Sequence, residues 1–220
     1  MAKHYVKLNE KNEIIVGYSD EFPIEVPLSE LVLIRKDGER HFEIDGSSEL
    51  TEGEIYLYRY EKGGIVKKTD KEIREEKEKR QFPLAKKAKL EEINEMCEQV
   101  IAKGITIPTS GGDKTFSLTP KDQINLMGLT ARLQSGDPAL ASGIPYHANG
   151  ELCKPWSVEE FMNISNAATG FVFYHTTYVN FLRAYVERMG TLQELETVTY
   201  GMELPEDLNA QMKELLGGIA

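Results

Sequence analysis

Histidines and cysteines are the first side chains to consider for chemistry in this sequence. His175 falls on the apolar stripe of the longest predicted helix, where a buried histidine with satisfied hydrogen bonds is the better interpretation. The remaining histidines are scattered and lack the spacing of a metal-ligand motif such as His-Glu-x-x-His; they are His4, His41 and His147. The sequence therefore predicts no metal site.

The two cysteines also lack the surroundings of a reactive thiol. Cys97 lies on a helical core stripe and Cys153 in a predicted strand, and neither has a nearby group that would favour its thiolate. Gly111-Gly112 is not followed by the Lys-Ser/Thr of a phosphate-binding loop. We therefore expect no catalytic residue, no cofactor and no enzymatic activity. An acid–base pair of carboxylates that only the fold brings together stays an open alternative.

Three tyrosines form the one candidate interface in the sequence. Tyr56, Tyr58 and Tyr60 alternate along a predicted strand, so their side chains share one face. Tyrosine combines a large apolar ring with a polar tip and is enriched at binding surfaces. The alternative is that this face is an ordinary half-buried strand face.

Composition restricts the classes of partner. The 220 residues carry a formal net charge of −10 at pH 7, which disfavours nucleic acid. No apolar run reaches the roughly 18 residues that a membrane-spanning helix needs. The first residues lack the apolar core of a signal peptide, so we expect no cleaved signal and no membrane insertion.

The N-terminal part, residues 1–69, is predicted to be a small antiparallel β module. Short apolar segments alternate with turn residues, among them Asp37-Gly38 and Gly63-Gly64, which is the pattern of β-hairpins. Three hairpins are expected, with strands at 5–8 and 14–18, at 31–35 and 41–44, and at 55–60 and 65–68.

Residues 70–83 are predicted to form a charged helical connector. Pairs of opposite charge such as Glu76 and Arg80 are one helical turn apart, and Ile73 is the single apolar residue before residue 81. Such a helix cannot bury a face, so we expect it to be exposed to solvent and to end or kink near Pro83.

Residues 84–190 are predicted to be a mostly helical module with two short hairpins. A helix ending at Gly104 is followed by a hairpin at 105–107 and 115–117, and a second hairpin at 144–147 and 151–154 precedes the longest helix. In the middle helix, Ile124, Met127 and Ala131 fall on one apolar stripe. A short amphipathic helix at 205–216 lies in the C-terminal part, residues 191–220. The predicted class is α+β.

Two helix starts have a clear local explanation. Thr119 can accept a hydrogen bond from the backbone of Asp122, and Ser157 with Glu160 has the spacing of a capping box. Gln123 and Asn125 are not explained by capping, and Asn125 could tie this junction to the neighbouring hairpin.

From Leu84 to about Met189, the chain resembles a domain family of unknown function found in the tail regions of tailed bacteriophages and prophages. The matching residues are Lys86-x-x-Lys89-Leu90-x-x-Ile93-x-x-x-Cys97, Gly104, Phe116-Ser117-Leu118-Thr119-Pro120-x-Asp122-Gln123-x-Asn125-Leu126, Gly150, Cys153, Ser157-x-x-Glu160-Phe161 and Tyr178-x-x-Phe181-Leu182. The segment after Met189 has no counterpart in this resemblance, and its helix is a candidate contact for a specific partner.

The resemblance implies a structural component of a phage tail or tail-like particle, at the baseplate or the tail-fibre apparatus. Its partners would be other tail, baseplate or fibre proteins, in a homo-oligomer or a symmetric assembly. It would be made in the host cytoplasm and reside in the virion tail. The alternative is a tail-fibre assembly chaperone, followed by a small enzyme acting at the host surface.

Overall fold

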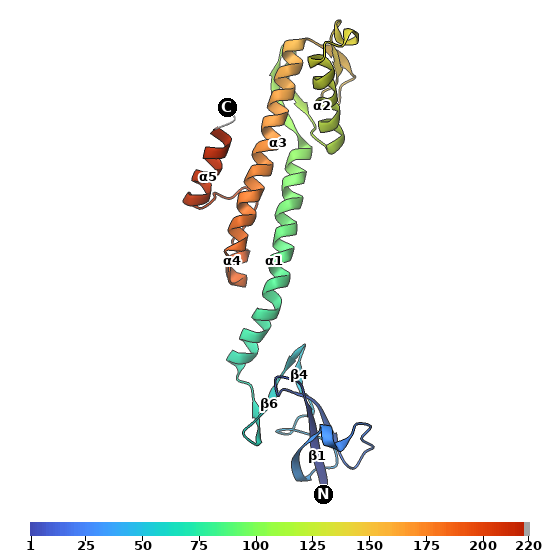
Figure 1. Ribbon diagram of the computed structural model, residues 1–220, viewed down its shortest axis with the longest axis vertical. Helices are drawn as coiled ribbons and strands as arrows, with labels where there is room; N and C mark the ends of the chain where they lie inside the picture. Colours follow the sequence, from blue (N-terminus) through green and yellow to red (C-terminus); the bar gives the residue numbers. More distant parts are fainter. Residues whose placement is uncertain (218–220) are drawn as a thin grey trace. The chain divides into compact units, whose positions relative to one another are not determined.

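The computed structural model describes residues 1–217 and has the predicted α+β class (Figure 1). The chain divides into two compact units, Met1–Gln81 and the part from Phe82 onward, and the division falls inside helix α1 (Asp70–Lys103). Residues 70–81 thus group with the first unit, and residues from 191 onward group with the second. The end of the predicted segment 191–220 lies outside the described residues.

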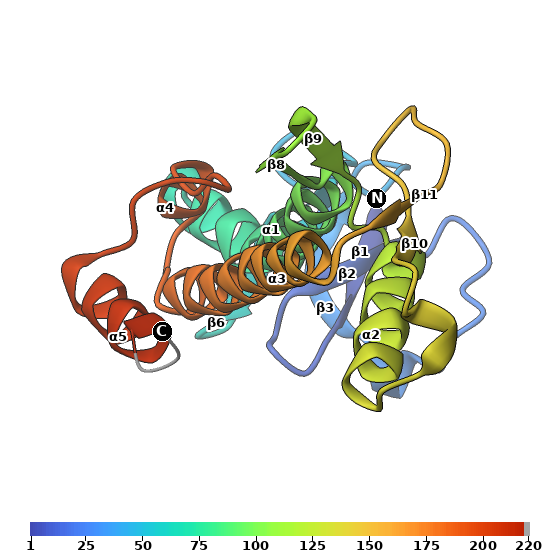
Figure 2. The same ribbon diagram turned by 90° about the horizontal axis from the view of Figure 1, so that it is seen from above.

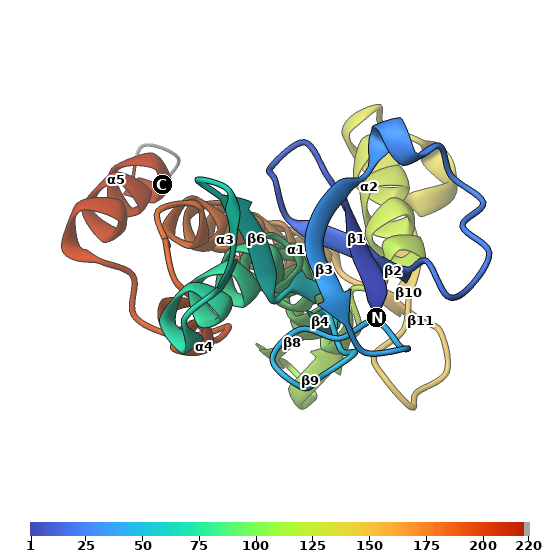
Figure 3. The same ribbon diagram turned by 90° about the horizontal axis from the view of Figure 1, so that it is seen from below.

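The first unit is built on a three-stranded antiparallel sheet with the order β2-β1-β3 (Figure 3). Its strands are β1 (Ala2–Leu8), β2 (Ile14–Ser19) and β3 (Val32–Gly38), with a short 3-10 helix, η1 (Leu28–Glu30), between the last two. Ala2, His4 and Val6 alternate along β1 and are buried. The first predicted hairpin is confirmed.

The hairpin predicted around Asp37-Gly38 is wrong. Strand β3 continues through Gly38, which pairs with Ala2 of β1, and residues 41–44 form no strand. The imidazole of His4 packs on Gly38, where an added Cβ would lie 2.6 Å from the ring. The second edge of β1 therefore takes up this segment, and the glycine serves close packing rather than a turn.

The rest of the first unit is a set of short hairpins. Its strands are β4 (Thr51–Glu52), β5 (Ile55–Tyr56), β6 (Tyr58–Glu61) and β7 (Gly64–Lys67). The single strand predicted at 55–60 is interrupted at Leu57, whose backbone N–H donates to Leu50 and whose carbonyl accepts from Lys68. The third predicted hairpin is confirmed, and Lys62 and Gly63 provide the positive φ angles of its turn.

Helix α1 does not end at Pro83 but continues for twenty residues, to Lys103. Its first part is also less exposed than predicted. Ile73 is buried, and Glu76 reaches Lys68, which is itself buried at the edge of the β module. Contacts made by its side chains, rather than an apolar face, fix this charged segment on the first unit.

The second unit continues from the later part of α1 through small hairpins into two long helices. Its elements are β8 (Ile105–Thr109), β9 (Gly112–Phe116), α2 (Pro120–Gln134), the 3-10 helix η2 (Pro138–Leu140), β10 (Ile144–Tyr146), β11 (Lys154–Trp156), α3 (Val158–Glu187), α4 (Leu192–Glu196) and α5 (Glu206–Gly217). Helices α2 and α5 lie on opposite sides of α3 (Figure 2).

The core of the second unit lies between α1, α2, α3 and the hairpins. Helices α1 and α3 run antiparallel, because Lys86 contacts Glu187 while Cys97 contacts the backbone of His175. Gly104 ends α1 with φ +85°, and an added Cβ there would lie 1.8 Å from the carbonyl oxygen of Phe116. This close approach lets β8 leave the helix directly toward the core.

Two predictions for this unit are corrected. In α2 the leucines Leu126, Leu129 and Leu133 face the core, so the stripe of Ile124, Met127 and Ala131 lies on the exposed side. The second hairpin is wider than expected, since Ile144 pairs with Trp156 and Tyr146 with Lys154. Cys153 is therefore outside the strand, and it is exposed.

Candidate functional site

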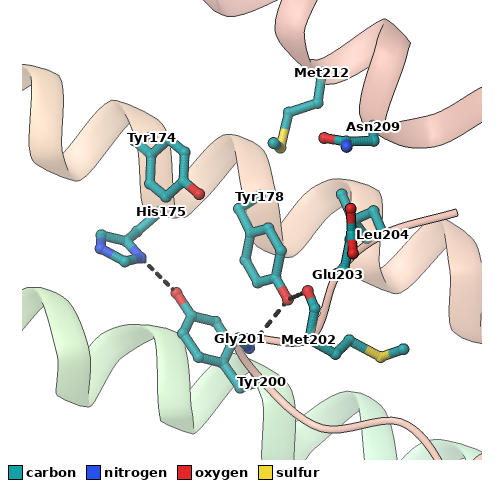
Figure 4. A pocket seen from close by; sticks show the side chains of 10 residues that line it. All are labelled: Tyr174, His175, Tyr178, Tyr200, Gly201, Met202, Glu203, Leu204, Asn209 and Met212. Carbon is teal, nitrogen blue, oxygen red and sulfur yellow. Dashed lines mark hydrogen bonds between the residues drawn. The ribbon is translucent and has the colours of Figure 1, made fainter. Parts of the chain in front are cut away.

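The candidate site is a pocket of about 300 Å³ between α3, the segment 200–204 and α5 (Figure 4). Helix α3 contributes Tyr174, His175 and Tyr178, which lie within one helical turn of each other. The remaining lining residues follow α4 in the chain; they are Tyr200, Gly201, Met202, Glu203, Leu204, Asn209 and Met212.

Tyr178 fixes the backbone that closes one side of this pocket. Its hydroxyl donates to the carbonyl of Met202 at 2.7 Å and accepts from the N–H of Gly201 at 3.0 Å. Gly201 has φ +93°, a conformation that glycine adopts without strain. The ring of Tyr200 meets that of Tyr178 edge-on, with centroids 5.3 Å apart. One buried tyrosine thus positions the turn and its aromatic neighbour.

His175 and Cys97 meet at the base of the pocket but do not form a nucleophile–base pair. Nδ1 of His175 is 2.8 Å from the hydroxyl of Tyr200, and the thiol of Cys97 donates to the backbone carbonyl of His175. Burial lowers the pKa of His175, raises the pKa of the Cys97 thiol and raises the pKa of Tyr200. The neutral forms are favoured at all three residues, so the thiol is not activated.

The mouth of the pocket offers contacts rather than reactive groups. The ring of Tyr174 is 44% exposed and stacks beside that of Tyr178, while Glu203 and Asn209 line the opposite side. Such a surface can hold a small side chain against aromatic rings. Within residues 1–217, no group of three or more His, Cys, Asp and Glu side chains could hold a metal ion. None of the helices in this part of the chain is long and apolar enough to cross a membrane.

The predicted tyrosine face is divided by the fold. Tyr58 is 2% exposed and belongs to the core of the first unit with Val6 and Ile14, so it is unavailable to a partner. Tyr56 and Tyr60 are half-buried. Their role in an interface stays a prediction, whereas Tyr58 is corrected to a core residue.

The predicted caps have structural roles. Thr119 Oγ1 accepts from the N–H of Asp122, and the Asp122 carboxylate accepts from the N–H of Thr119 at 3.1 Å and from Ser117 Oγ at 2.9 Å. Burial would raise the pKa of Asp122, but these hydrogen bonds outweigh it and lower the pKa. The start of α2 is thus held by a full capping box.

The cap at Ser157 differs from the predicted reciprocal box. Ser157 Oγ accepts from the N–H of Glu160, but the Glu160 carboxylate accepts from the N–H and hydroxyl of Ser110 as well as from the Ser157 hydroxyl. These bonds lower the pKa of Glu160. Glu160 therefore ties the start of α3 to the turn between β8 and β9.

The tie between the α2 junction and the second hairpin comes from Asn149 rather than Asn125. The side-chain oxygen of Asn149 accepts from the N–H of Ser117 at 2.9 Å, whereas Asn125 is exposed. The Gln123 amide donates to the carbonyl of Leu118 at 2.8 Å, which accounts for that residue.

Sequence reasoning identified His175 but missed the pocket around it. His175 is half-buried and hydrogen-bonded, as predicted. The spacing of Tyr174 and Tyr178 was a detectable signal, since it places both on one helix face. Tyr200 and Met212 join them only through the path of the chain after α4, for which the sequence has no comparable signal.

Comparison with known proteins identifies part of the second unit. A family model described as a domain of unknown function (DUF4376) matches residues 84–197, which is slightly more than half of the chain. The match covers the later part of α1 through α4 and ends before Tyr200 and α5. No curated protein and no solved structure gives a significant match.

Proposed function

We propose, from the premise that this chain belongs to the DUF4376 family, that the protein is a structural component of a phage tail or tail-like particle. It would act at the baseplate or the tail-fibre apparatus through protein–protein contacts. The phage context rests on the resemblance described above, between residues 84 to about 189 and a family found in phage and prophage tail regions. Shared membership of a family does not by itself fix a role, so the surface of the molecule provides the further argument.

The observation that carries the proposal is the exposed apolar side of α2. Ile124 is 68% exposed and Met127 is 72% exposed, and they are one helical turn apart. Isolated exposed apolar residues are common on monomeric proteins, but neighbouring ones on a helix indicate a contact surface. This surface lies inside the region that the family model matches.

The chemistry of the pocket is also that of a contact rather than a catalyst. The hydroxyl of Tyr178 and the imidazole of His175 are engaged within the protein, and the thiol of Cys97 is buried and neutral. A general acid or base must be able to exchange a proton with a substrate. None of these three groups has a free, ionised partner in the pocket.

The assembly chaperone remains the alternative, with one supporting observation weakened. It drew on an exposed, charged connector, but charges in the first part of α1 pair within the first unit. Lys77 binds Glu52, and Glu76 binds both Lys68 and Arg80. Fewer free charges are left for a transient client than the sequence alone indicated.

Particle composition tests the proposal. Tails purified from the phage or prophage that encodes this chain are expected to contain it, at a fixed number of copies per particle, by quantitative mass spectrometry. Washing at high salt provides the control for loosely attached protein. A protein that is needed for fibre folding but absent from washed particles would be a chaperone, and the structural proposal would then be wrong.

A further inference from the structure

A groove of about 360 Å³ lies between α2 and α3, beside the exposed side of α2. Its apolar lining comes from Leu118, Leu126, Met127, Ala168, Val172 and Phe173. Met127 and Phe173 stand at its rim and are 72% and 37% exposed. The groove and the exposed α2 side therefore form one continuous apolar surface within the second unit.

The polar side chains of the groove do not make it polar. Thr169 donates to the carbonyl of Ser165 at 2.8 Å, and Thr176 donates to the carbonyl of Val172 at 2.9 Å. The amide of Gln123 is likewise bound to Leu118. Because both threonine hydroxyls turn back onto their own helix, few free donors are left for a bound segment.

The groove continues toward α1 and becomes acidic there. A second hollow of about 560 Å³ shares Leu118, Gln123, Val172 and Thr176 with the first and ends at Glu95 and Glu98. Both glutamates are exposed, and neither forms a salt bridge within residues 1–217. No described residue that lines either hollow is basic.

We propose that this groove binds a helical segment of a partner protein that has apolar side chains along one face and lysine or arginine at one end. The apolar side chains would lie between α2 and α3, and the basic end would meet Glu95 and Glu98. This inference deepens the proposed function and rests on it, since it names the chemistry of one tail partner.

Helical structure in the occupant follows from the hydrogen bonding of the groove. The walls are side chains of three helices, so there is no free strand edge to pair with an extended peptide. A segment buried there must satisfy its own backbone groups, as a helix does. The choice of a basic end follows from charge complementarity with the two free glutamates. A second copy of this chain would instead bring a further net charge of −10.

Binding of designed peptides to the full-length protein tests the assignment. The probes are fluorescein-labelled amphipathic peptides of about four helical turns, with leucines at helical spacing and three lysines at either the first or the last turn. Control peptides carry glutamates in place of the lysines. One of the two lysine peptides is expected to bind, and binding should weaken as salt is raised, because the acidic end contributes charge attraction.

Protein variants locate the binding. Met127→Glu is expected to weaken binding of that peptide by about tenfold or more, since it places a charge in the apolar part. Glu95→Gln with Glu98→Gln should weaken binding several-fold and reduce its salt dependence. Leu152→Glu is the matched control, because Leu152 is 91% exposed, lies outside the groove and undergoes the same change of charge. Thermal unfolding verifies that each variant is folded.

Several outcomes would overturn the assignment: no binding of either lysine peptide, equal binding of the glutamate peptides, or binding that Met127→Glu leaves unchanged. A dimer in sedimentation that Met127→Glu dissociates would assign the groove to a second copy instead. Failure of peptide binding with the protein present in washed tails would reject this inference alone. Absence from washed tails with peptide binding intact would reject the structural proposal.

Discussion

Thr119 shows how a residue can mark a family while serving the fold. Its hydroxyl and backbone N–H both take part in the capping box with Asp122. Thr119→Ala should lower the free energy of unfolding by about 1 kcal/mol, because one helix N–H loses its acceptor. Chemical denaturation followed by the fluorescence of Trp156, the only tryptophan, provides the measurement.

Thr119→Ser is the matched control, since it keeps the hydroxyl and should retain most of the stability. Unchanged stability in Thr119→Ala with a loss of partner binding would contradict the structural role. Both capping pairs could be predicted from the sequence because their partners are three residues apart. The link from Glu160 to Ser110 could not, because it depends on tertiary structure.

Lys68 forms the principal buried ion pair of the first unit. Its ammonium group binds Glu13, from which it is separated by 55 residues, and Glu76 at 2.6 Å. Lys68→Met should destabilise the first unit by about 3–5 kcal/mol, because it leaves the carboxylate of Glu13 buried without its cation. The double variant Glu13→Gln/Lys68→Met should recover much of that loss. Amide hydrogen exchange of β1 would measure both, and a double variant no better than the single one would contradict this explanation.

The same pair sets the response of the first unit to pH. Burial would raise the pKa of Glu13, but hydrogen bonds from Lys68 and Asn9 lower it in the folded state. Its contribution to stability is therefore present above the pKa of the unfolded chain and is lost as pH falls through the lowered pKa. Burial would lower the pKa of Lys68, yet its bonds to Glu13 and Glu76 raise it. That contribution is present below the unfolded pKa and is lost as pH rises through the raised one.

This dependence can be checked by following hydrogen exchange of β1 across the acid range. Protection should decrease at pH values below the ordinary pKa of a glutamate, and Glu13→Gln should flatten the decrease. A wild-type profile that Glu13→Gln leaves unchanged would assign the acid response to other carboxylates.

At the scale of elements, helix faces and strand pairings were harder to predict than helix positions. Helix α2 has two apolar stripes, and periodicity alone does not decide which one faces the core. The structure buries the leucines and exposes Ile124 and Met127. Likewise, Asp37-Gly38 is a strong local turn signal, but pairing along β1 prevails over it.

Helix-interior glycines permit a prediction at this scale. An added Cβ at Gly170 of α3 would meet no atom within 4 Å. Gly170→Ala should therefore raise the free energy of unfolding of the isolated protein by about 0.5–1 kcal/mol, through the higher helix propensity of alanine. Gly104→Ala is the contrasting variant and should destabilise, since it would meet the backbone of Phe116. Thermal unfolding of both variants tests the pair, and a destabilised Gly170→Ala would contradict the prediction.

At the scale of the whole molecule, the two units have separate cores, and their stabilities should respond separately. Lys68→Met should affect hydrogen exchange of β1, and Thr119→Ala should affect the signal of Trp156. In the double variant, the two losses are expected to add within about 0.5 kcal/mol, because the sites share no partner. A clearly larger or smaller sum would show energetic coupling through α1.

How far the sequence reached also differs between the two units. The α+β class and most helices followed from periodicity and caps, which are local. The burial of Tyr58 and the assembly of Tyr178 with Tyr200 depend on residues that only the fold brings together. The function could not be derived from chemistry, since the described side chains form no reactive constellation, and it rests on resemblance and on exposed surface.

The segment beyond the family match has a consequence for how such a domain can diversify. Tyr178 holds the turn at Gly201, and Leu208 and Met212 of α5 join the core beside α3. A family domain that ended at residue 197 would leave this flank of α3 open to solvent. A change of tail can therefore redirect which flank a neighbour reaches, with no substitution in the shared core.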